Sequence, residues 1–345
     1  MAPVRNARYI FTEVPEEYPE PGRHFRYDDS QIVDLESVSL DGGILVKTLV
    51  LSLDPYMRGR MRPPSKESYT NPFRIGESLS GYGVGVILRS EHEAYALGDH
   101  VTYVDIPHQE YFVVKPNPFL RKIPSDAGVP WSLFIGVLGM PGQTAYASWK
   151  EYAKPQKGQT VFVSTAAGAV GSFVVQLAKL DGMKVIASSG SDEKAAFTKE
   201  CGADVSFNYK TTSTEEILQK EGPIDVYYDN VGGETLDLAF KYAAKNARFI
   251  ECGMISIYNK PDKSYPFKHL MEIIGKQISV NGFLVFDLVP KWGKQFYEEM
   301  PRLVKEGKIK FQEDRSYGLD QIGEAFVAVQ KGTNNGKKVV VVAED

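Results

Sequence analysis

Two patterns of hydrophobic and polar positions divide the chain. Residues 1 to about 125 hold short runs in which apolar and polar residues alternate, such as "ILVKTLVLSLDP" and "HVTYV", separated by glycine, proline and aspartate. Alternation of this kind is typical of strands that bury one face. The first part of the chain is therefore predicted to be a mostly antiparallel β domain.

From about residue 130 the pattern changes to apolar strands that alternate with helices. Segment 131–153 is apolar and largely helical, with Pro141 expected to break it. Beyond it the pattern predicts strands at 160–164, 184–189, 204–207, 224–229, 247–252 and 278–285, and helices at 169–181, 192–201, 213–221, 233–244, 267–276 and 290–306. This alternation predicts a parallel, doubly wound sheet of the Rossmann type, and hence an α/β fold class.

The C-terminal run "GKKVVVVAED" is one more β segment, and we expect it to return to the first domain as a strand. The chain is accordingly divided into a discontinuous β domain, residues 1–128 and 310–345, and an inserted doubly wound domain, residues 129–309.

The segment "STAAGAVGS", residues 164–172, follows the first predicted strand of the second domain. Gly168 and Gly171 hold the second and third positions of the Gly-x-Gly-x-x-Gly fingerprint, while Ala166 replaces the first glycine. The second glycine lets the backbone approach a pyrophosphate, and the third lets the helix pack closely on the strand. A junction of small residues without a ligand is the alternative, and the six strands that follow weigh against it.

The end of the second strand bears on the choice between NAD and NADP. Enzymes that use NAD place an acidic residue there to hold the ribose 2′-hydroxyl. Here the strand ends in Ser189-Gly190-Ser191, which leaves room for a 2′-phosphate, and Lys194 follows. Asp192 and Glu193 argue the other way, but both suit the first turn of a helix capped by Ser191. NADP is favoured, with a plain surface lysine as the alternative for Lys194.

Composition and charge exclude several classes of protein. The net charge is −4, so no basic face for nucleic acid is expected, and "YMRGRMR" is interpreted as a local patch. No apolar run is long enough to cross a membrane, and the N-terminus lacks the apolar core of a signal peptide. Two cysteines far apart in sequence predict no disulfide framework and a cytoplasmic location.

No metal site is predicted. Two isolated cysteines cannot supply a four-cysteine zinc site, and none of the five histidines lies in a compact ligand motif. Without a Lewis acid, reduction of an already polarised C=C bond is easier to explain than oxidation of an alcohol.

Several stretches in order along the chain resemble one family. They are "LSLDPYMRGRM", "GYGVGVI", "LGMPGQTAYA", "AAGAVGSFVVQLAKL", "GSDEK", "FNYK", "YYDNVGGETLD", "ECGMISIYN" and "NGFLV". Together they are similar to the zinc-free, NADPH-dependent double-bond reductases of the medium-chain dehydrogenase/reductase superfamily, which include alkenal/one oxidoreductases, prostaglandin reductases and leukotriene B4 12-hydroxydehydrogenase-like enzymes.

The resemblance implies a GroES-like β domain, a Rossmann NADPH domain and a homodimer. It also implies α,β-unsaturated aldehydes and ketones as substrates, with hydride going from nicotinamide C4 to the β-carbon and a proton to the α-carbon. A quinone oxidoreductase of the same superfamily and a nucleotide-binding protein without turnover are the alternatives.

The same resemblance assigns cofactor roles to individual residues. Those expected to bind NADPH are Pro55, Ala167, Gly168, Ala169, Val170, Gly171, Gly190, Lys194, Tyr209, Asn230, Cys252, Tyr258, Phe283, Leu284, Val285 and Asn335. Within this set the turn from Ala167 to Gly171 serves the pyrophosphate. Gly190, Lys194 and Tyr209 serve the 2′-phosphate, and Phe283 to Val285 flank the nicotinamide.

The resemblance also implies that Tyr56 and Tyr258 are the candidate catalytic and substrate-binding residues, and Tyr82 in "GYGVG" is a further candidate for the substrate pocket. Negative charge grows on the substrate carbonyl oxygen as hydride arrives, so a donor is needed there. A phenol, with an ordinary pKa of about 10, is a neutral donor at pH 7. The alternative is packing, because the chain holds 19 tyrosines. Arg58 is expected to order a loop or bind a phosphate, with a surface role equally open.

Overall fold

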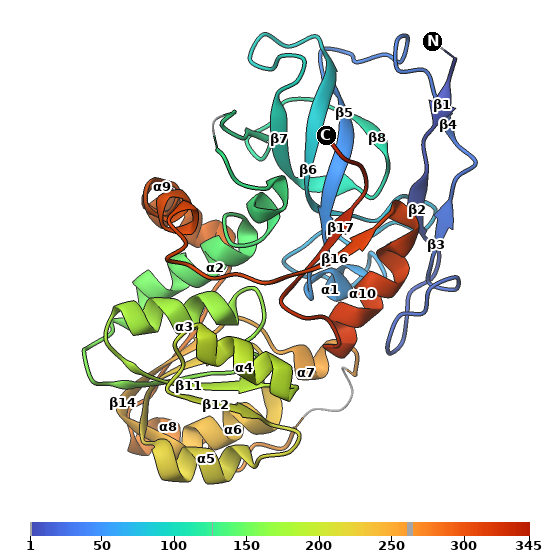
Figure 1. Cartoon of the computed structure of the whole chain (residues 1–345). Coiled ribbons are helices and arrows are strands. Elements are labelled where there is room, and N and C mark those ends of the chain that lie inside the picture. The colour runs from blue at the N-terminus through green and yellow to red at the C-terminus, as the bar shows by residue number, and fades with distance from the viewer. Residues whose placement is uncertain (1, 126, 261–264) are drawn as a thin grey trace. The chain divides into compact units, whose positions relative to one another are not determined.

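The computed structural model describes residues 2–125, 127–260 and 265–345, which form two compact units. The first unit comprises residues 1–136, 313–334 and 338–345, and the second comprises 137–312 and 335–337. Figure 1 shows the chain entering the second unit after the first β-rich part and returning near its C-terminus.

The first unit is built on a sheet that, within the described residues, has seven strands. Its order is β16 (Glu313–Tyr317), β17 (Lys337–Val341), β5 (Ile44–Ser52), β6 (Ser80–Ser90), β7 (His100–Pro107) and β9 (Arg121–Lys122), with β8 (Tyr111–Val114) also paired to β5. β5 pairs antiparallel with β6, β8 and β17. The C-terminal segment therefore returns to the first unit as a strand, which confirms that prediction.

Smaller elements complete this unit. β1 (Val4–Arg5) pairs with β4 (Ile32–Val33), and β2 (Arg8–Phe11) pairs with β3 (Phe25–Asp28). The helices are α1 (Met57–Arg60), η1 (Trp131–Ile135), η3 (Leu319–Gln321) and α10 (Ile322–Lys331). α10 buries Ile322 and Phe326, and the Phe326 ring lies 5.5 Å from that of Phe25. Burial of these apolar faces supplies the main stabilisation of the unit.

The second unit is a parallel sheet with, in the described chain, six strands. The order is β12 (Val205–Asn208), β11 (Lys184–Ser189), β10 (Thr160–Val163), β13 (Ile224–Asp229), β14 (Ala243–Glu251) and β15 (Ser279–Gly282). The strand order reverses between β10 and β13, and ligands bind at the carboxyl ends of strands at such a switch point. The predicted α/β fold class is confirmed.

Helices cover both faces of this sheet (Figure 1). α3 (Gly171–Leu180) and α4 (Asp192–Glu200) lie on one face, and α5 (Thr214–Glu221), α6 (Gly233–Tyr242) and α8 (Glu272–Gly275) on the other. The remaining helices are α2 (Met140–Ser148), η2 (Trp149–Ala153), α7 (Ile255–Tyr258) and α9 (Val285–Lys305). A row of aromatic rings with neighbouring centroids 5.0 to 5.3 Å apart fills the core between the sheet and α6: Phe162 stacks on Tyr227, Tyr227 meets Phe249 edge-on, and Phe249 stacks on Phe240 of α6.

Three sequence predictions for this unit need correction. Pro141 does not break a helix: it lies in the first turn of α2, where its missing N–H costs nothing. The strand predicted at 278–285 ends at Gly282, because Val285 begins a 21-residue amphipathic helix that buries Phe296 and Met300. The helix predicted at 267–276 is reduced to the four residues of α8.

Candidate cofactor and active site

The glycine-rich turn between β10 and α3 is tightly packed. A Cβ on Gly171 would lie 2.5 Å from the carbonyl oxygen of Thr165 and 2.8 Å from the Cα of Ala166, so only glycine fits there. A Cβ on Gly168 would lie 3.2 Å from the same carbonyl oxygen. The contact at Gly171 matches the close packing of helix on strand that the fingerprint expects of its third glycine, while the role of Gly168 toward a pyrophosphate stays a prediction.

The missing first glycine has a structural explanation. Thr165 adopts the left-handed backbone conformation, with φ +49°, immediately before Ala166. Ala166 is buried, and its N–H donates to the Ser188 carbonyl oxygen at 2.9 Å. The strain of the turn thus falls on Thr165, one residue earlier than the fingerprint predicts, and an alanine methyl fits at position 166.

The residues predicted for the 2′-phosphate come together at the ends of β11 and β12. A Cβ on Gly190 would lie 3.2 Å from the Tyr209 hydroxyl, and the Tyr209 N–H donates to the Ser189 carbonyl oxygen at 3.0 Å. Lys194 lies in the first turn of α4, where its N–H donates to the N-cap Ser191 Oγ at 3.3 Å. The ring of Tyr209 is half exposed, at 50%.

Two polar groups near this cluster add detail that the sequence does not give. The Ser189 hydroxyl is buried and has no hydrogen-bond partner in the described part of the chain, as expected of a group that awaits a ligand. Asp192, the apparent argument for NAD, accepts a hydrogen bond from Asn208 Nδ2 at 3.0 Å. Its carboxylate therefore has the structural role that the sequence interpretation favours.

Asn230 and Cys252 follow β13 and β14 at the carboxyl edge of the sheet. Asn230 Nδ2 donates to the Ser164 carbonyl oxygen at 2.7 Å, which ties this loop to the end of β10. The Cys252 N–H donates to the Asp229 carbonyl oxygen at 2.9 Å. Burial raises the pKa of the Cys252 thiol to about 12, which favours the neutral thiol at pH 7.

Tyr258 ends the short helix α7, just beyond Cys252. Its hydroxyl oxygen accepts a hydrogen bond from the Met254 N–H at 3.3 Å. A Cβ on Gly253 would lie 2.9 Å from the same oxygen, so the glycine makes room for the phenol. The Tyr258 side chain is thereby folded over the turn that follows β14.

The predicted nicotinamide residues form the connection between β15 and α9. The Phe283 ring lies 6.1 Å from that of Tyr152, Leu284 precedes the helix and Val285 begins it. Asn335 is part of the second unit, as the first residue of the short segment 335–337, and the chain on both sides of this segment belongs to the first unit. The next residue, Gly336, has φ +73°, and a Cβ there would lie 2.3 Å from the Gln312 carbonyl oxygen.

The remaining candidates, Pro55, Tyr56 and Tyr82, belong to the first unit. Tyr56 directly precedes α1, and burial raises its pKa well above the ordinary value, with further contributions from the charge of Asp54 and from Tyr82 on β6. This direction keeps the phenol protonated at neutral pH, where it can donate a hydrogen bond. The Pro55 carbonyl oxygen accepts a hydrogen bond from Gln330 Nε2 at 3.2 Å, which ties the loop to α10.

The arginines of "YMRGRMR" hold this tyrosine loop in place. The Arg58 guanidinium is buried and donates to the carbonyl oxygens of Pro15 and Glu17, at 3.0 and 2.8 Å. Arg60 donates to the Ser80 carbonyl oxygen at 2.8 Å, and its guanidinium lies 4.2 Å above the Phe73 ring centroid. Of the roles left open for Arg58, ordering a loop is the one observed, because its donors are bound to backbone carbonyls.

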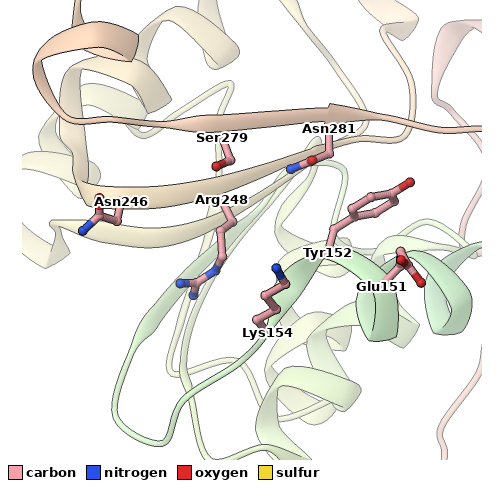
Figure 2. Close-up of a pocket in the computed structure, with 7 residues that line it drawn as sticks. All are labelled: Glu151, Tyr152, Lys154, Asn246, Arg248, Ser279 and Asn281. Carbon is pink, nitrogen blue, oxygen red and sulfur yellow. The ribbon is translucent and has the colours of Figure 1, made fainter.

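A pocket of about 210 Å³ lies elsewhere in the second unit (Figure 2). It is lined by Glu151, Tyr152, Lys154, Asn246, Arg248, Ser279 and Asn281. These residues come from the end of η2 and from β14 and β15, and none of them is a predicted site residue. Arg248 donates to Gln159 Oε1 at 2.6 Å, and the Glu151 carboxylate binds Lys291 at 2.7 Å.

The structure thus brings together the candidates within each unit: Pro55, Tyr56 and Tyr82 in the first, and the others around the carboxyl edge of the parallel sheet in the second. Among residues 2–125, 127–260 and 265–345, no group of three or more histidines, cysteines or carboxylates could hold a metal ion. Over the same residues, no helix has the length and apolar character needed to cross a membrane.

Comparison with known proteins identifies the family. Residues 8–121 match a domain described as the N-terminal domain of oxidoreductase, and residues 169–306 match one described as zinc-binding dehydrogenase. The chain is 41% identical to an NADP-dependent 2-alkenal reductase of Nicotiana tabacum over 88% of each chain. It is 39% identical to a (+)-pulegone reductase of Mentha piperita, over 88% of this chain and 89% of the relative.

A solved structure extends the likeness over almost the whole chain. CurA of Vibrio vulnificus in complex with NADPH shares 31% identity with a TM-score of 0.88, covering 98% of this chain and 100% of the other. The chain therefore belongs to the medium-chain dehydrogenase/reductase family. Within this family, the relatives described above are reductases named for an alkenal and for the enone pulegone.

Proposed function

We propose that the protein is an NADPH-dependent reductase of the C=C bond of α,β-unsaturated aldehydes and ketones. The observation that carries the proposal is the glycine-rich turn at the switch point of the sheet, where a Cβ on Gly171 would lie 2.5 Å from the Thr165 carbonyl oxygen, so that the start of α3 packs closely against the end of β10. The likeness to a 2-alkenal reductase and a pulegone reductase over 88% of the chain supports the choice of substrate class.

The residues present fit the cofactor. The N–H groups at the start of α3 would hold the pyrophosphate, and Lys194, Tyr209 and the buried Ser189 hydroxyl would hold the 2′-phosphate side of the adenosine. Phe283 to Val285, Cys252 and Asn335 would flank the nicotinamide and its ribose, with Asn230 and Pro55 completing the set. When bound, NADPH supplies a hydride from nicotinamide C4 to the substrate β-carbon.

The tyrosines complete the reaction. As hydride arrives, negative charge develops on the carbonyl oxygen, and a hydrogen-bond donor placed there lowers the barrier. Tyr56 serves as that donor because its phenol is kept protonated, and Tyr82 shapes the pocket beside it. Tyr258, held over the Cys252–Met254 turn, orients the oxygen or donates the proton that reaches the α-carbon.

The proposal also covers zinc, cellular location, nucleic-acid binding and the bounds of the two domains. The reaction proceeds without zinc, since a conjugated C=C bond is already polarised. The protein acts in the cytoplasm, where its two free cysteines stay reduced, and it binds no nucleic acid. The β domain spans 1–128 and 310–345, and the NADPH domain spans 129–309.

A homodimer is proposed for the working enzyme. β15 is an edge strand of the parallel sheet, and Val280 on it is 44% exposed. Met271 and Ile274, just before it in sequence, are 74% and 71% exposed. An unpaired edge with apolar side chains favours pairing with a second copy of the chain.

Turnover with a panel of acceptors tests the function. Purified protein is mixed with NADPH and, separately, with a hydroxyalkenal, an aromatic enone and a naphthoquinone. We expect NADPH oxidation with the first two. Oxidation with the quinone alone would favour the quinone oxidoreductase alternative, and tight NADPH binding without any turnover would favour a non-catalytic role.

A further inference from the structure

Two buried carboxyl groups, Asp229 and Glu251, lie side by side at the carboxyl edge of the parallel sheet. They are register partners at the ends of the neighbouring strands β13 and β14. Both carboxyl oxygens of Glu251 are buried and lack a donor among the residues that the structure describes. Two ionised carboxylates in such a place would repel each other strongly, because the surroundings are poor in water.

Asp229 is the carboxyl group of the pair that accepts hydrogen bonds from the surrounding loops. Its carboxylate accepts hydrogen bonds from the Val231 N–H at 2.8 Å, the Gly232 N–H at 3.0 Å and the Tyr227 hydroxyl at 2.7 Å. Ser164 Oγ, at the end of β10, also donates to it at 3.1 Å. A negative charge on Asp229 therefore fixes the loop that carries Asn230 and the left-handed pair Gly232 and Gly233.

The same residue also holds the loop after β14. The Asp229 carbonyl oxygen accepts hydrogen bonds from the N–H groups of Cys252 and Gly253, at 2.9 and 3.1 Å. Three loops of the proposed cofactor site, those after β10, β13 and β14, thus meet at one aspartate. Any movement of Asp229 would therefore displace Asn230, Cys252 and the turn beneath Tyr258.

Glu251 is the carboxyl group of the pair that holds a proton, so that the buried pair carries one negative charge instead of two. Burial, followed by the nearby charge of Asp229 and a side-chain hydrogen bond with it, raises the pKa of Glu251 to about 9. Other titratable groups at the pair are Tyr227 and Cys252, and burial keeps both neutral. On α6, Glu234 is exposed and Asp237 is bound by His269 at 3.0 Å.

We propose that Asp229 and Glu251 share one proton, and that this protonated pair is the positioning device that holds the cofactor loops. Glu251 carries the proton and donates it in a hydrogen bond to Asp229, whose negative charge then binds the backbone N–H groups of Val231 and Gly232. Loss of the proton places two like charges at adjacent strand ends and loosens the loops. The inference rests on the proposed NADPH site.

The direct test is the pH dependence of NADPH binding, measured by fluorescence titration between pH 7.5 and 10. If protein in which both Asp229 and Glu251 are ionised does not bind NADPH, the dissociation constant of the wild type for NADPH rises about tenfold between pH 8 and pH 10. Glu251→Gln keeps a donor to Asp229 but cannot lose a proton, so its dissociation constant stays flat and close to the wild-type value at pH 8. Glu234→Gln, an exposed change nearby, serves as the control and keeps the wild-type profile.

A second measurement needs no cofactor. The pKa of Glu251 is raised above its usual 4.5, so the protonated group stabilises the fold fully below pH 4.5, and this stabilisation is lost as pH rises to about 9. The melting temperature of the ligand-free wild type should therefore fall from pH 6 to pH 9 relative to Glu251→Gln. The substitution should raise the melting temperature at pH 9.

If wild type and Glu251→Gln show identical pH profiles in both NADPH binding and melting temperature, the proposal that Asp229 and Glu251 share a proton is wrong. Glu251→Leu distinguishes a hydrogen-bonding role of Glu251 from a packing role. This variant should bind NADPH more weakly at every pH, because Asp229 loses its hydrogen-bond donor. If Glu251→Leu instead binds as tightly as Glu251→Gln, the positioning role is wrong. A wild type that binds NADPH and reduces no enal would contradict the proposed function and leave this test intact.

Discussion

At the scale of single residues, the site depends on groups whose charge state is set by burial. Tyr56 is kept as a neutral phenol, Cys252 as a neutral thiol, and Asp192 is bound to Asn208. In the proposed function, the donor to the substrate oxygen and the site for the 2′-phosphate depend on these local surroundings. The chemistry proposed here therefore makes sharp predictions for individual side chains.

Removing the Tyr258 hydroxyl tests its place in the reaction. In Tyr258→Phe we expect kcat to fall by at least about tenfold, since a positioned proton donor contributes roughly 10²–10⁴ to such steps. The Michaelis constant for NADPH should change little. Tyr317→Phe, at a side chain that is 67% exposed, is the matched control. Unchanged single-turnover rates in Tyr258→Phe would remove this residue from the mechanism.

We propose that Lys194 sets the preference for NADPH over NADH. Hydrogen bonds to charged groups contribute about 1.5–3 kcal/mol, so Lys194→Ala should weaken NADPH binding by roughly 10- to 150-fold and leave NADH binding nearly unchanged. Calorimetric titration of both cofactors provides the measurement. Lys199→Ala, on the exposed side of the same helix, should change neither affinity. Equal losses for NADPH and NADH would show that Lys194 does not bind the 2′-phosphate.

Some of these residues can be predicted from sequence and others cannot. Tyr56, Lys194 and Gly171 stand in local motifs, so their expected positions follow from the few residues around them. Asp229 and Glu251 lie in different motifs and become neighbours only through the register of two strands. For Arg58 the sequence leaves loop ordering, phosphate binding and a surface role open, and only the fold shows its hydrogen bonds to the distant Pro15 and Glu17 carbonyls.

At the scale of elements, strand–turn–helix units place the site. Each of β10, β11, β13 and β14 ends in a loop that carries candidate residues, and the switch in strand order gathers the loops after β10 and β13. Alternating apolar strands and helices make this arrangement predictable. The ends of α8 and α9 were harder to predict, because the extent of α9 is set by packing of Phe296 and Met300 rather than by local propensity.

Gly171→Ala tests the close approach of α3 to β10. The added Cβ would meet the Thr165 carbonyl oxygen at 2.5 Å, and backbone atoms cannot yield cheaply, so overpacking should cost about 1–3 kcal/mol of unfolding free energy. Chemical denaturation would measure this loss, and NADPH affinity should fall with it. Gly275→Ala, where a Cβ meets nothing within 4 Å, should keep both stability and affinity. Tolerance of Gly171→Ala would contradict the role given to the third glycine.

At the scale of the whole molecule, the chain folds into a β-rich unit, which contains Tyr56, and a parallel-sheet unit, which contains the glycine-rich turn. Because β15 is an exposed edge strand, we expect it to pair with a second copy of the chain. Light scattering after size exclusion should give twice the chain mass of 38.4 kDa. Val280→Lys should shift the protein toward the monomer, because a charge on an edge strand opposes pairing. A monomeric wild type at micromolar concentration would refute the dimer.

The fate of the transferred hydride tests the central claim most directly. NADPH carrying deuterium at the transferred C4 position is incubated with the protein and an enone, and the product is examined by NMR and mass spectrometry. The account predicts a saturated ketone with one deuterium on the β-carbon. Deuterium on the carbonyl carbon of an allylic alcohol, or a product without deuterium, would contradict it.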